Sequence, residues 1–124
     1  MNEGEQRELL MEFEKNRQML TNVTMQKQQL TMQKEITDSS IEELGKTKEK
    51  SVYKAVGNLL VPKTVEEMKK ELADKKETID LRLKTIEKQE ETFLKKLNSI
   101  RAKLEGASKE EAEDEKPKDK KQKK

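Results

Sequence analysis

Neighbouring glutamates are the residues of this sequence whose type and spacing come closest to catalytic chemistry. Such pairs include those at 42–43, 66–67 and 90–91. General acid and base catalysis needs two carboxylates in different, partly buried surroundings, so that their pKa values separate. Adjacent glutamates on one helix face share a solvated environment, and a hard cation would need oxygens converging from a shaped loop. The pattern therefore favours a solvated helix surface over a catalytic or metal site.

Other common chemistries lack their residues. The chain has no histidine and no cysteine, so the commonest general base and metal ligand are missing, as are thiolates and disulfides. Gly57 and Asn58 belong to no phosphate-binding motif, because no Gly-x-Gly-x-x-Gly or Walker pattern is present. We therefore predict that the protein is not an enzyme and has no catalytic residue, no cofactor and no metal.

The composition excludes an ordinary globular core. Of the 124 residues, 30% are hydrophobic, 2% aromatic and 44% charged, whereas globular domains are about half apolar and a quarter charged. The apolar residues must lie in narrow stripes. The 28 basic and 26 acidic residues nearly balance, which argues against nucleic acid or membrane as a partner. Without a signal-peptide pattern or an apolar run of ~18 residues, we expect a cytoplasmic protein.

The first segment is predicted to be a helix that runs to Leu44. Asn2 and Glu5 resemble a capping box at its start, and Gly45 suits its end. Steps of four and three residues trace a mostly apolar coiled-coil seam. The seam positions are Leu9, Phe13, Asn16, Leu20, Val23, Lys27, Leu30, Lys34, Thr37, Ile41 and Leu44. Residues 37–40 are short and polar, and we expect the helix to fray or bend there.

The second helix is predicted from a second capping box, Thr64 to Glu67, to Gly106. Apolar residues recur every seven positions, which imposes left-handed supercoiling against a partner helix. They are Val65, Leu72, Ile79, Ile86, Phe93 and Ile100. The companion positions are Lys69, Lys76, Leu83, Glu90, Leu97 and Leu104. The two helices are nearly equal in length, so a tight connection makes them antiparallel neighbours.

Folding the two seams together matches apolar residues in six layers. The predicted layers are Leu44 with Val65, Ile41 with Met68, Leu30 with Ile79, Val23 with Ile86, Phe13 with Leu97, and Leu9 with Ile100. The same register sets Lys34 opposite Lys76. That layer is unfavourable unless Glu35 and Glu77 lean in or the register shifts locally.

The connection between the helices, about residues 51–63, is predicted to be a β-hairpin. Gly57 and Asn58 suit a two-residue type II′ turn between two apolar runs, and Pro62 should end central-strand pairing. A lone hairpin is marginal in water and has unpaired edges, so we expect its partner strands on other subunits. The alternative is an irregular apolar loop packed on the helices. The assembly residues are Val52, Tyr53, Val56, Gly57, Asn58, Leu59, Leu60 and Val61.

The far end of the helix pair carries more apolar residues than one seam needs. We call this set the tip: Leu9, Leu10, Met11, Phe13, Phe93, Leu94, Leu97, Ile100 and Leu104. Exposed apolar groups rimmed by charge indicate a site for the hydrophobic surface of other proteins. Alternatively, a third helix or a subunit contact covers them. Four methionines in the first helix (positions 11, 19, 25 and 32) suit a promiscuous binding surface or fill gaps beside the seam.

The last residues have a different composition. Residues 107–124 contain no large apolar side chain and pass from an acidic to a basic block. Such a segment cannot offset the entropy of ordering, so we predict a disordered tail. The chain then divides into a coiled coil with its hairpin, 1–106, and the tail, 107–124. The tail either only solvates the protein or forms a weak electrostatic docking site.

Two stretches resemble the β subunit of prefoldin, of the archaeal type. The hairpin sequence from Val52 to Val61 resembles the strand–Gly-Asn–strand core of that family. The stretch from Leu81 to Glu91 is similar to the family's second helix, and the resemblance covers residues 5–105 in layout. The charged tail has no assigned role in the family pattern.

The resemblance implies an ATP-independent co-chaperone. It implies two α and four β subunits whose hairpins join in an oligomeric β-barrel, with coiled coils that hold unfolded polypeptides at their tips and pass them to a group II chaperonin. The fold class expected is mainly α: a long antiparallel two-helix coiled coil connected by one β-hairpin, with a disordered C-terminal tail.

Two rival interpretations remain open. One is a coiled-coil spacer or assembly protein that oligomerises through its hairpin but binds no unfolded client. The other is nucleic-acid binding through Lys116–Lys124, which would make affinity steeply salt-dependent.

Overall fold

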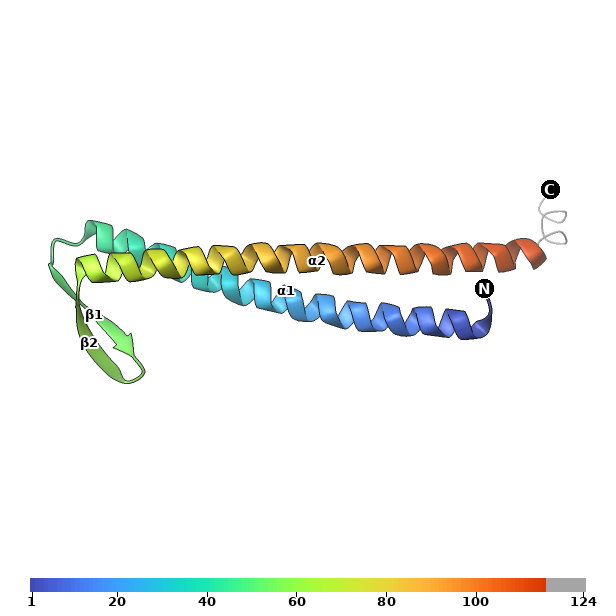
Figure 1. Cartoon of the computed structure of the whole chain (residues 1–124), viewed down its shortest axis with the longest axis horizontal. Coiled ribbons are helices and arrows are strands. Elements are labelled where there is room, and N and C mark those ends of the chain that lie inside the picture. Colours follow the sequence, from blue (N-terminus) through green and yellow to red (C-terminus); the bar gives the residue numbers. More distant parts are fainter. Residues whose placement is uncertain (116–124) are drawn as a thin grey trace. The chain divides into compact units, whose positions relative to one another are not determined.

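Two helices joined by a hairpin make up the fold of the computed structural model, which describes residues 1–115, with side chains as far as residue 107. Helix α1 (Glu3–Lys46) is followed by strands β1 (Ser51–Val56) and β2 (Leu59–Thr64) and by helix α2 (Val65–Glu115) (Figure 1). This order confirms the predicted fold class of two long helices connected by one hairpin.

The ends of α1 follow the sequence signals. The backbone N–H of Glu5 donates to Asn2 Oδ1 at 2.8 Å, and Asn2 Nδ2 donates to Glu5 Oε1 at 3.1 Å. Asn2 therefore caps the helix as predicted and satisfies one backbone donor of the first turn, while Glu5 returns a bond to the Asn2 side chain and not to its backbone N–H as in a full capping box. At the other end α1 stops at Lys46, one residue beyond Gly45. The helix is continuous through residues 37–40, so the predicted fraying is not observed.

The hairpin closes on the predicted turn. Val56 pairs with Leu59, and the register continues antiparallel to Ser51 with Thr64. Gly57 has a φ of 59°, whereas no other described residue has a positive φ. This combination matches a type II′ turn, which needs positive φ only at its first central residue.

Pro62 corrects one sequence expectation. It does not end the ladder: β2 runs through it to Thr64, and Pro62 pairs with Tyr53. Beyond the last ladder pair, the Val65 N–H donates to the Lys50 carbonyl at 3.0 Å. Because hydrogen-bonded and non-hydrogen-bonded pairs alternate in an antiparallel ladder, the Tyr53–Pro62 pair falls at a non-hydrogen-bonded position. The missing N–H of Pro62 therefore costs the hairpin no internal hydrogen bond.

Helix α2 begins where predicted and ends later. The Glu67 N–H donates to Thr64 Oγ1 at 3.1 Å, which caps the first turn. The helix then continues through Gly106 to Glu115, so the end predicted at Gly106 is wrong. Gly106 does not adopt the left-handed conformation of a terminal glycine. Of the tail predicted to be disordered, residues 116–124 lie outside the described residues, as does the basic run proposed for nucleic acid.

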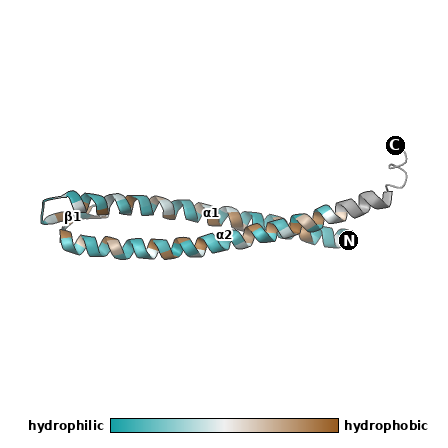
Figure 2. Cartoon of the chain, turned by 90° about the horizontal axis from the view of Figure 1, so that it is seen from above, coloured by the Kyte–Doolittle hydropathy of each residue, from teal (hydrophilic) through white to brown (hydrophobic). Residues whose placement is uncertain are grey.

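The structure divides into two compact units. The hairpin unit is Met25–Glu87, and the terminal unit comprises Met1–Thr24 and the chain from Lys88 onward. Apolar bands recur between hydrophilic ones along both helices (Figure 2). In the hairpin unit the buried apolar residues are Leu30, Leu44, Val65, Ile79, Leu83 and Ile86. In the terminal unit they are Val23, Leu97, Ile100 and Ala107.

Burial confirms the predicted seams with one exception. All eleven seam positions of α1 are buried or half-buried. In α2, Lys69 is exposed and Met68 is half-buried in its place, because a step of three from Val65 lands on an apolar side chain. The seam also continues past Gly106, since Ala107 is buried.

Ion pairs compensate the lysine layer of the hairpin unit. Lys34 Nζ lies 3.1 Å from Asp80 Oδ1, and Lys76 Nζ lies 2.9 Å from Asp38 Oδ1. Moving four residues along α1, from Lys34 to Asp38, moves the partner four residues back along α2, from Asp80 to Lys76. This is the relation that antiparallel helices require. The compensating acids are the two aspartates. The suggestion that Glu35 and Glu77 would fill this role is wrong, since both are exposed.

Candidate assembly and client-binding surfaces

The two faces of the hairpin differ in exposure. Val52 and Lys54 of β1, with Val61 and Lys63 of β2, point to one side and are half-buried. The opposite side carries Tyr53, Ala55, Leu60 and Pro62, and all four are exposed. Tyr53 is 71% and Leu60 is 69% accessible. An open apolar face on a sheet of two strands indicates a surface that another protein covers.

An ion pair and an apolar contact region connect the hairpin to the helices. The Lys54 ammonium pairs with the Glu71 carboxylate of α2, and this hydrogen bond, ahead of nearby lysines, lowers the pKa of Glu71. Beside it lies a hollow of about 470 Å³ between the end of α1, the start of α2 and β1. Its apolar lining residues are Leu44, Val52, Met68 and Leu72. The ion pair ties the hairpin to α2, whereas the residues at the turn are exposed.

The predicted assembly residues mostly lie on the surface. Val56 and Leu59 flank the turn and are exposed, as are Gly57 and Asn58 between them. Val52 and Val61 are half-buried on the side that carries Lys54. The hairpin unit therefore presents apolar side chains at the turn and across the open face.

The tip residues fall into three groups in the terminal unit. Leu97 and Ile100 are buried, so they support the surface and do not form it. The half-buried members are Leu9, Phe13, Phe93 and Leu104. The exposed members are Leu10, Met11 and Leu94. The structure thus places exposed apolar side chains beside half-buried rings in one unit.

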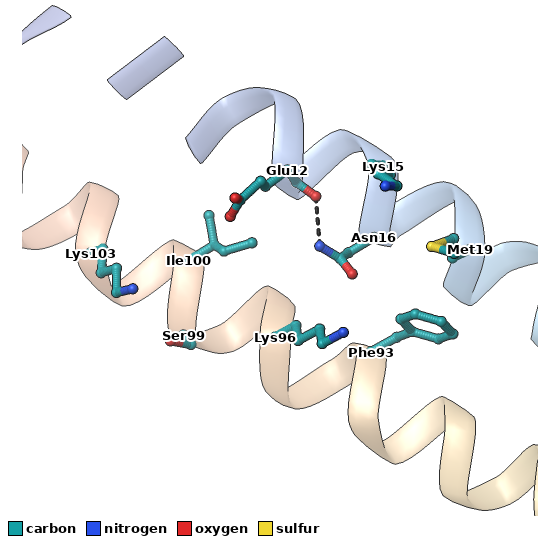
Figure 3. A pocket seen from close by; sticks show the side chains of 9 residues that line it. All are labelled: Glu12, Lys15, Asn16, Met19, Phe93, Lys96, Ser99, Ile100 and Lys103. Atoms are coloured by element: carbon teal, nitrogen blue, oxygen red, sulfur yellow. Dashed lines mark hydrogen bonds between the residues drawn. The ribbon is translucent and has the colours of Figure 1, made fainter. Parts of the chain in front are cut away.

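Lysines rim a groove in the terminal unit. The groove has a volume of about 500 Å³, and Phe93 and Ile100 extend into it from α2 (Figure 3). Lys96 Nζ lies 5.7 Å from the centre of the Phe93 ring, a cation–π distance. On the α1 side, Asn16 Nδ2 donates to the Glu12 carbonyl at 2.8 Å, so this polar seam residue is satisfied within its own helix. The remaining lining residues are Lys15, Met19, Ser99 and Lys103.

A smaller hollow lies beside the exposed Leu10. It has a volume of about 310 Å³ and is lined by Leu10, Phe13, Arg101, Leu104 and Glu105. The Arg101 guanidinium lies 6.0 Å from the centre of the Phe13 ring. Both aromatic rings of the tip thus have a cation over them, and the border of the two hollows carries Glu12 and Glu105 as well as basic side chains.

An exposed apolar stripe runs along α1 in the hairpin unit, and the sequence predicts only part of it. Met25, Met32 and Ile36 are all exposed. Spacings of seven and four place them on one face of the helix, away from the buried seam. The sequence points to the methionines as a candidate binding surface, whereas Ile36 and the exposed Leu81 of α2 appear only in the structure. The scarcity of charge in this part of the sequence could have indicated the stripe, because Lys27 is the only charged residue between Gln18 and Gln33.

Among residues 1–115 no helix is both long enough and apolar enough to cross a membrane. Among residues 1–107, whose side chains the structure describes, no group of three or more acidic side chains converges as metal ligands would.

Two long helices joined through a hairpin with an open apolar face define the class of two-helix coiled coils with one connecting hairpin. The family model described as prefoldin subunit matches residues 7–123. The chain belongs to the prefoldin family, whose members are chaperone subunits that assemble with other prefoldin subunits.

Individual relatives are of the beta type. The chain is 37% identical over 97 residues to prefoldin subunit beta of Archaeoglobus fulgidus, covering 77% of this chain and 84% of that protein. It is 31% identical over 113 residues to prefoldin subunit beta of Pyrobaculum aerophilum, covering 85% and 90%. The crystal structure of the prefoldin beta subunit from Thermococcus strain KS-1 matches with a TM-score of 0.76 and 30% identity, covering 83% of this chain and 91% of that one.

Proposed function

We propose that this chain is the β-type subunit of a cytoplasmic α2β4 prefoldin. Its hairpin joins those of sister subunits, and its tip holds segments of unfolded polypeptides. Holding requires neither nucleotide nor cofactor, and the held chain passes to a group II chaperonin. Members of the prefoldin family act as chaperone subunits, and the matched beta relatives support the subunit type.

One observation carries the proposed client site: apolar side chains are exposed in a chain that is otherwise dominated by charge. Leu10, Met11 and Leu94 are exposed in the terminal unit. Leu10 lines the smaller hollow together with Phe13, and Phe93 lines the larger groove of the same unit. Unfolded polypeptides expose apolar side chains without a fixed shape. A flexible methionine and shallow grooves suit such ligands, because they adapt to different side chains.

Weak individual contacts are sufficient for holding when several subunits act together. If assembly through the hairpins places several tips near one client, the second contact becomes intramolecular and its effective concentration rises. The lysines around the groove keep the apolar surface small. A small surface gives each tip low affinity, which allows the client to be released to a chaperonin.

The proposal is tested by making the exposed tip residues polar. The triple variant Leu10→Ser, Met11→Ser, Leu94→Ser removes exposed side chains and should leave the buried seam intact. The complex with an α-type subunit is prepared, and its mass is checked by native mass spectrometry. Light scattering then measures how well it suppresses aggregation of a chemically denatured client. We expect an intact complex with most of its holding activity lost.

A matched control removes an apolar residue of similar exposure elsewhere. Leu81→Ser changes a side chain that is 60% accessible on α2 and lies outside the tip, so holding should be retained. Equal activity of the triple variant and the wild type would contradict the tip assignment and favour the spacer interpretation. Addition of a group II chaperonin to the loaded complex separately tests transfer of the client.

A further inference from the structure

The two outer edges of the hairpin are not equivalent. In the alternating ladder, residues of non-hydrogen-bonded pairs direct their backbone N–H and C=O groups away from the partner strand. The hydrogen bond from Val65 to Lys50 fixes which pairs these are. They are Ser51 with Thr64, Tyr53 with Pro62, and Ala55 with Leu60. These six residues supply the groups with which each edge can bind another strand.

Only β1 has a complete set of such groups. Its outer edge carries the N–H groups of Ser51, Tyr53 and Ala55. The outer edge of β2 has an N–H at Leu60 and at Thr64, but none at Pro62, its central position. A strand added to β2 therefore finds a gap in the middle of its ladder, whereas a strand added to β1 finds none.

We infer that β1 provides the main docking edge and that its occupant is a β-strand of a second prefoldin subunit. The inference rests on the proposed assembly through the hairpin and adds a direction to it. The exposed face of Tyr53, Ala55, Leu60 and Pro62 spans both strands, so a strand added at β1 gains apolar cover as well as its backbone hydrogen bonds. The difference between the two edges lies in the missing donor of Pro62. Contact along β2 lacks the central donor and contributes less to holding the complex together.

Proline substitution at directly opposed residues tests the difference. Ala55 and Leu60 face each other, and neither N–H serves the internal ladder. Ala55→Pro and Leu60→Pro therefore remove one outward donor from β1 and from β2, respectively, while the hairpin keeps its own hydrogen bonds. Leu60→Ala controls for the lost leucine side chain. Circular dichroism and the unfolding midpoint of each isolated chain establish that the variants fold.

The readout is the dissociation constant of the complex with an α-type subunit, measured by native mass spectrometry over a dilution series. We expect Ala55→Pro to raise this constant by about tenfold or more, which corresponds to the loss of a hydrogen bond and close strand contact. Leu60→Pro should resemble Leu60→Ala. Equal effects of the two prolines, or a larger effect of Leu60→Pro relative to its control, would overturn the inference.

Hydrogen exchange on the unmodified complex gives an independent test. On assembly the amides of Tyr53 and Ala55 should gain more protection than the amide of Leu60. The reverse order contradicts the docking edge but leaves assembly through the hairpin intact. If the unmodified chain forms no complex at all, the proposed function itself fails, so the two failures are distinguishable.

Discussion

Lys76 Nζ lies 2.9 Å from Asp38 Oδ1, joining α2 to α1 in the hairpin unit. The hydrogen bond to Asp38 raises the pKa of Lys76 above its ordinary value near 10.5. Together with the pair of Lys34 and Asp80, this contact favours one register of α1 against α2 in the hairpin unit. Like charges would meet if one helix slid along the other.

The Lys76 pair predicts a loss of stability at high pH. A raised pKa means that the contribution is fully present below the ordinary lysine pKa and disappears as pH rises through the folded value. Asp38→Asn should lower the unfolding midpoint at pH 8 and reduce its decline above pH 10. Thermal unfolding followed by circular dichroism measures both. Asp74→Asn, on an exposed part of α2, is the control, and an equal effect of the two variants would refute the pairing.

The pair of Lys54 and Glu71 predicts a loss of stability in acid. The pKa of Glu71 is lowered chiefly by its hydrogen bond to Lys54. The contribution is therefore present above the ordinary glutamate pKa near 4.5 and disappears as pH falls through the folded value. Glu71→Gln should remove this part of the pH dependence and increase the exchange of hairpin amides at pH 7. Identical pH profiles for the variant and the wild type would show that the contact contributes nothing.

Ile79→Ala should be among the most destabilising single substitutions in the hairpin unit. Ile79 is only 3% accessible, and truncating a buried isoleucine costs about 2–5 kcal/mol through lost contacts and a residual cavity. Urea unfolding of the chain at fixed concentration measures the change. Leu81→Ala, two residues along on the exposed face, should change the free energy of unfolding by less than about 0.5 kcal/mol. Similar losses in the two variants would contradict the seam.

Gly57→Ala and Gly106→Ala should shift stability in opposite directions. Gly57 has a φ of 59°, where an alanine costs about 1–2 kcal/mol. Gly106 lies within α2, and a Cβ there would meet nothing within 4 Å. Alanine at that position should add about 0.5–1 kcal/mol by removing the helix penalty of glycine. A destabilising Gly106→Ala, measured by urea unfolding, would show that the helix ends there after all.

The helices and hairpin were predictable because their signals are local or strictly periodic. The capping residues Asn2 and Thr64, the seven-residue repeat and the Gly57–Asn58 turn each act over a few residues. Two errors came from treating single residues as stop signals. Pro62 and Gly106 were each expected to end an element, yet Pro62 falls where no N–H is needed, and the helix around Gly106 continues with Ala107 in its seam.

Side-chain partners across the helix pair were less predictable. The sequence placed Lys34 opposite Lys76, but it did not show that aspartates at 38 and 80 would compensate them. Long side chains reach diagonally across a seam, so a list of layers does not identify their contacts. The division of the tip into exposed, half-buried and buried residues likewise depends on how the helices pack.

Thr37 weakens the contact between the two helices of the hairpin unit. It is the most deeply buried residue described, at 1% accessible, and its hydroxyl donates to the Gln33 carbonyl of the same helix. Because its hydroxyl is already hydrogen-bonded within α1, this small side chain gives α2 less apolar contact than a leucine would. The two helices of the hairpin unit are therefore held together less tightly at this layer than at the layers of Leu30 and Leu44.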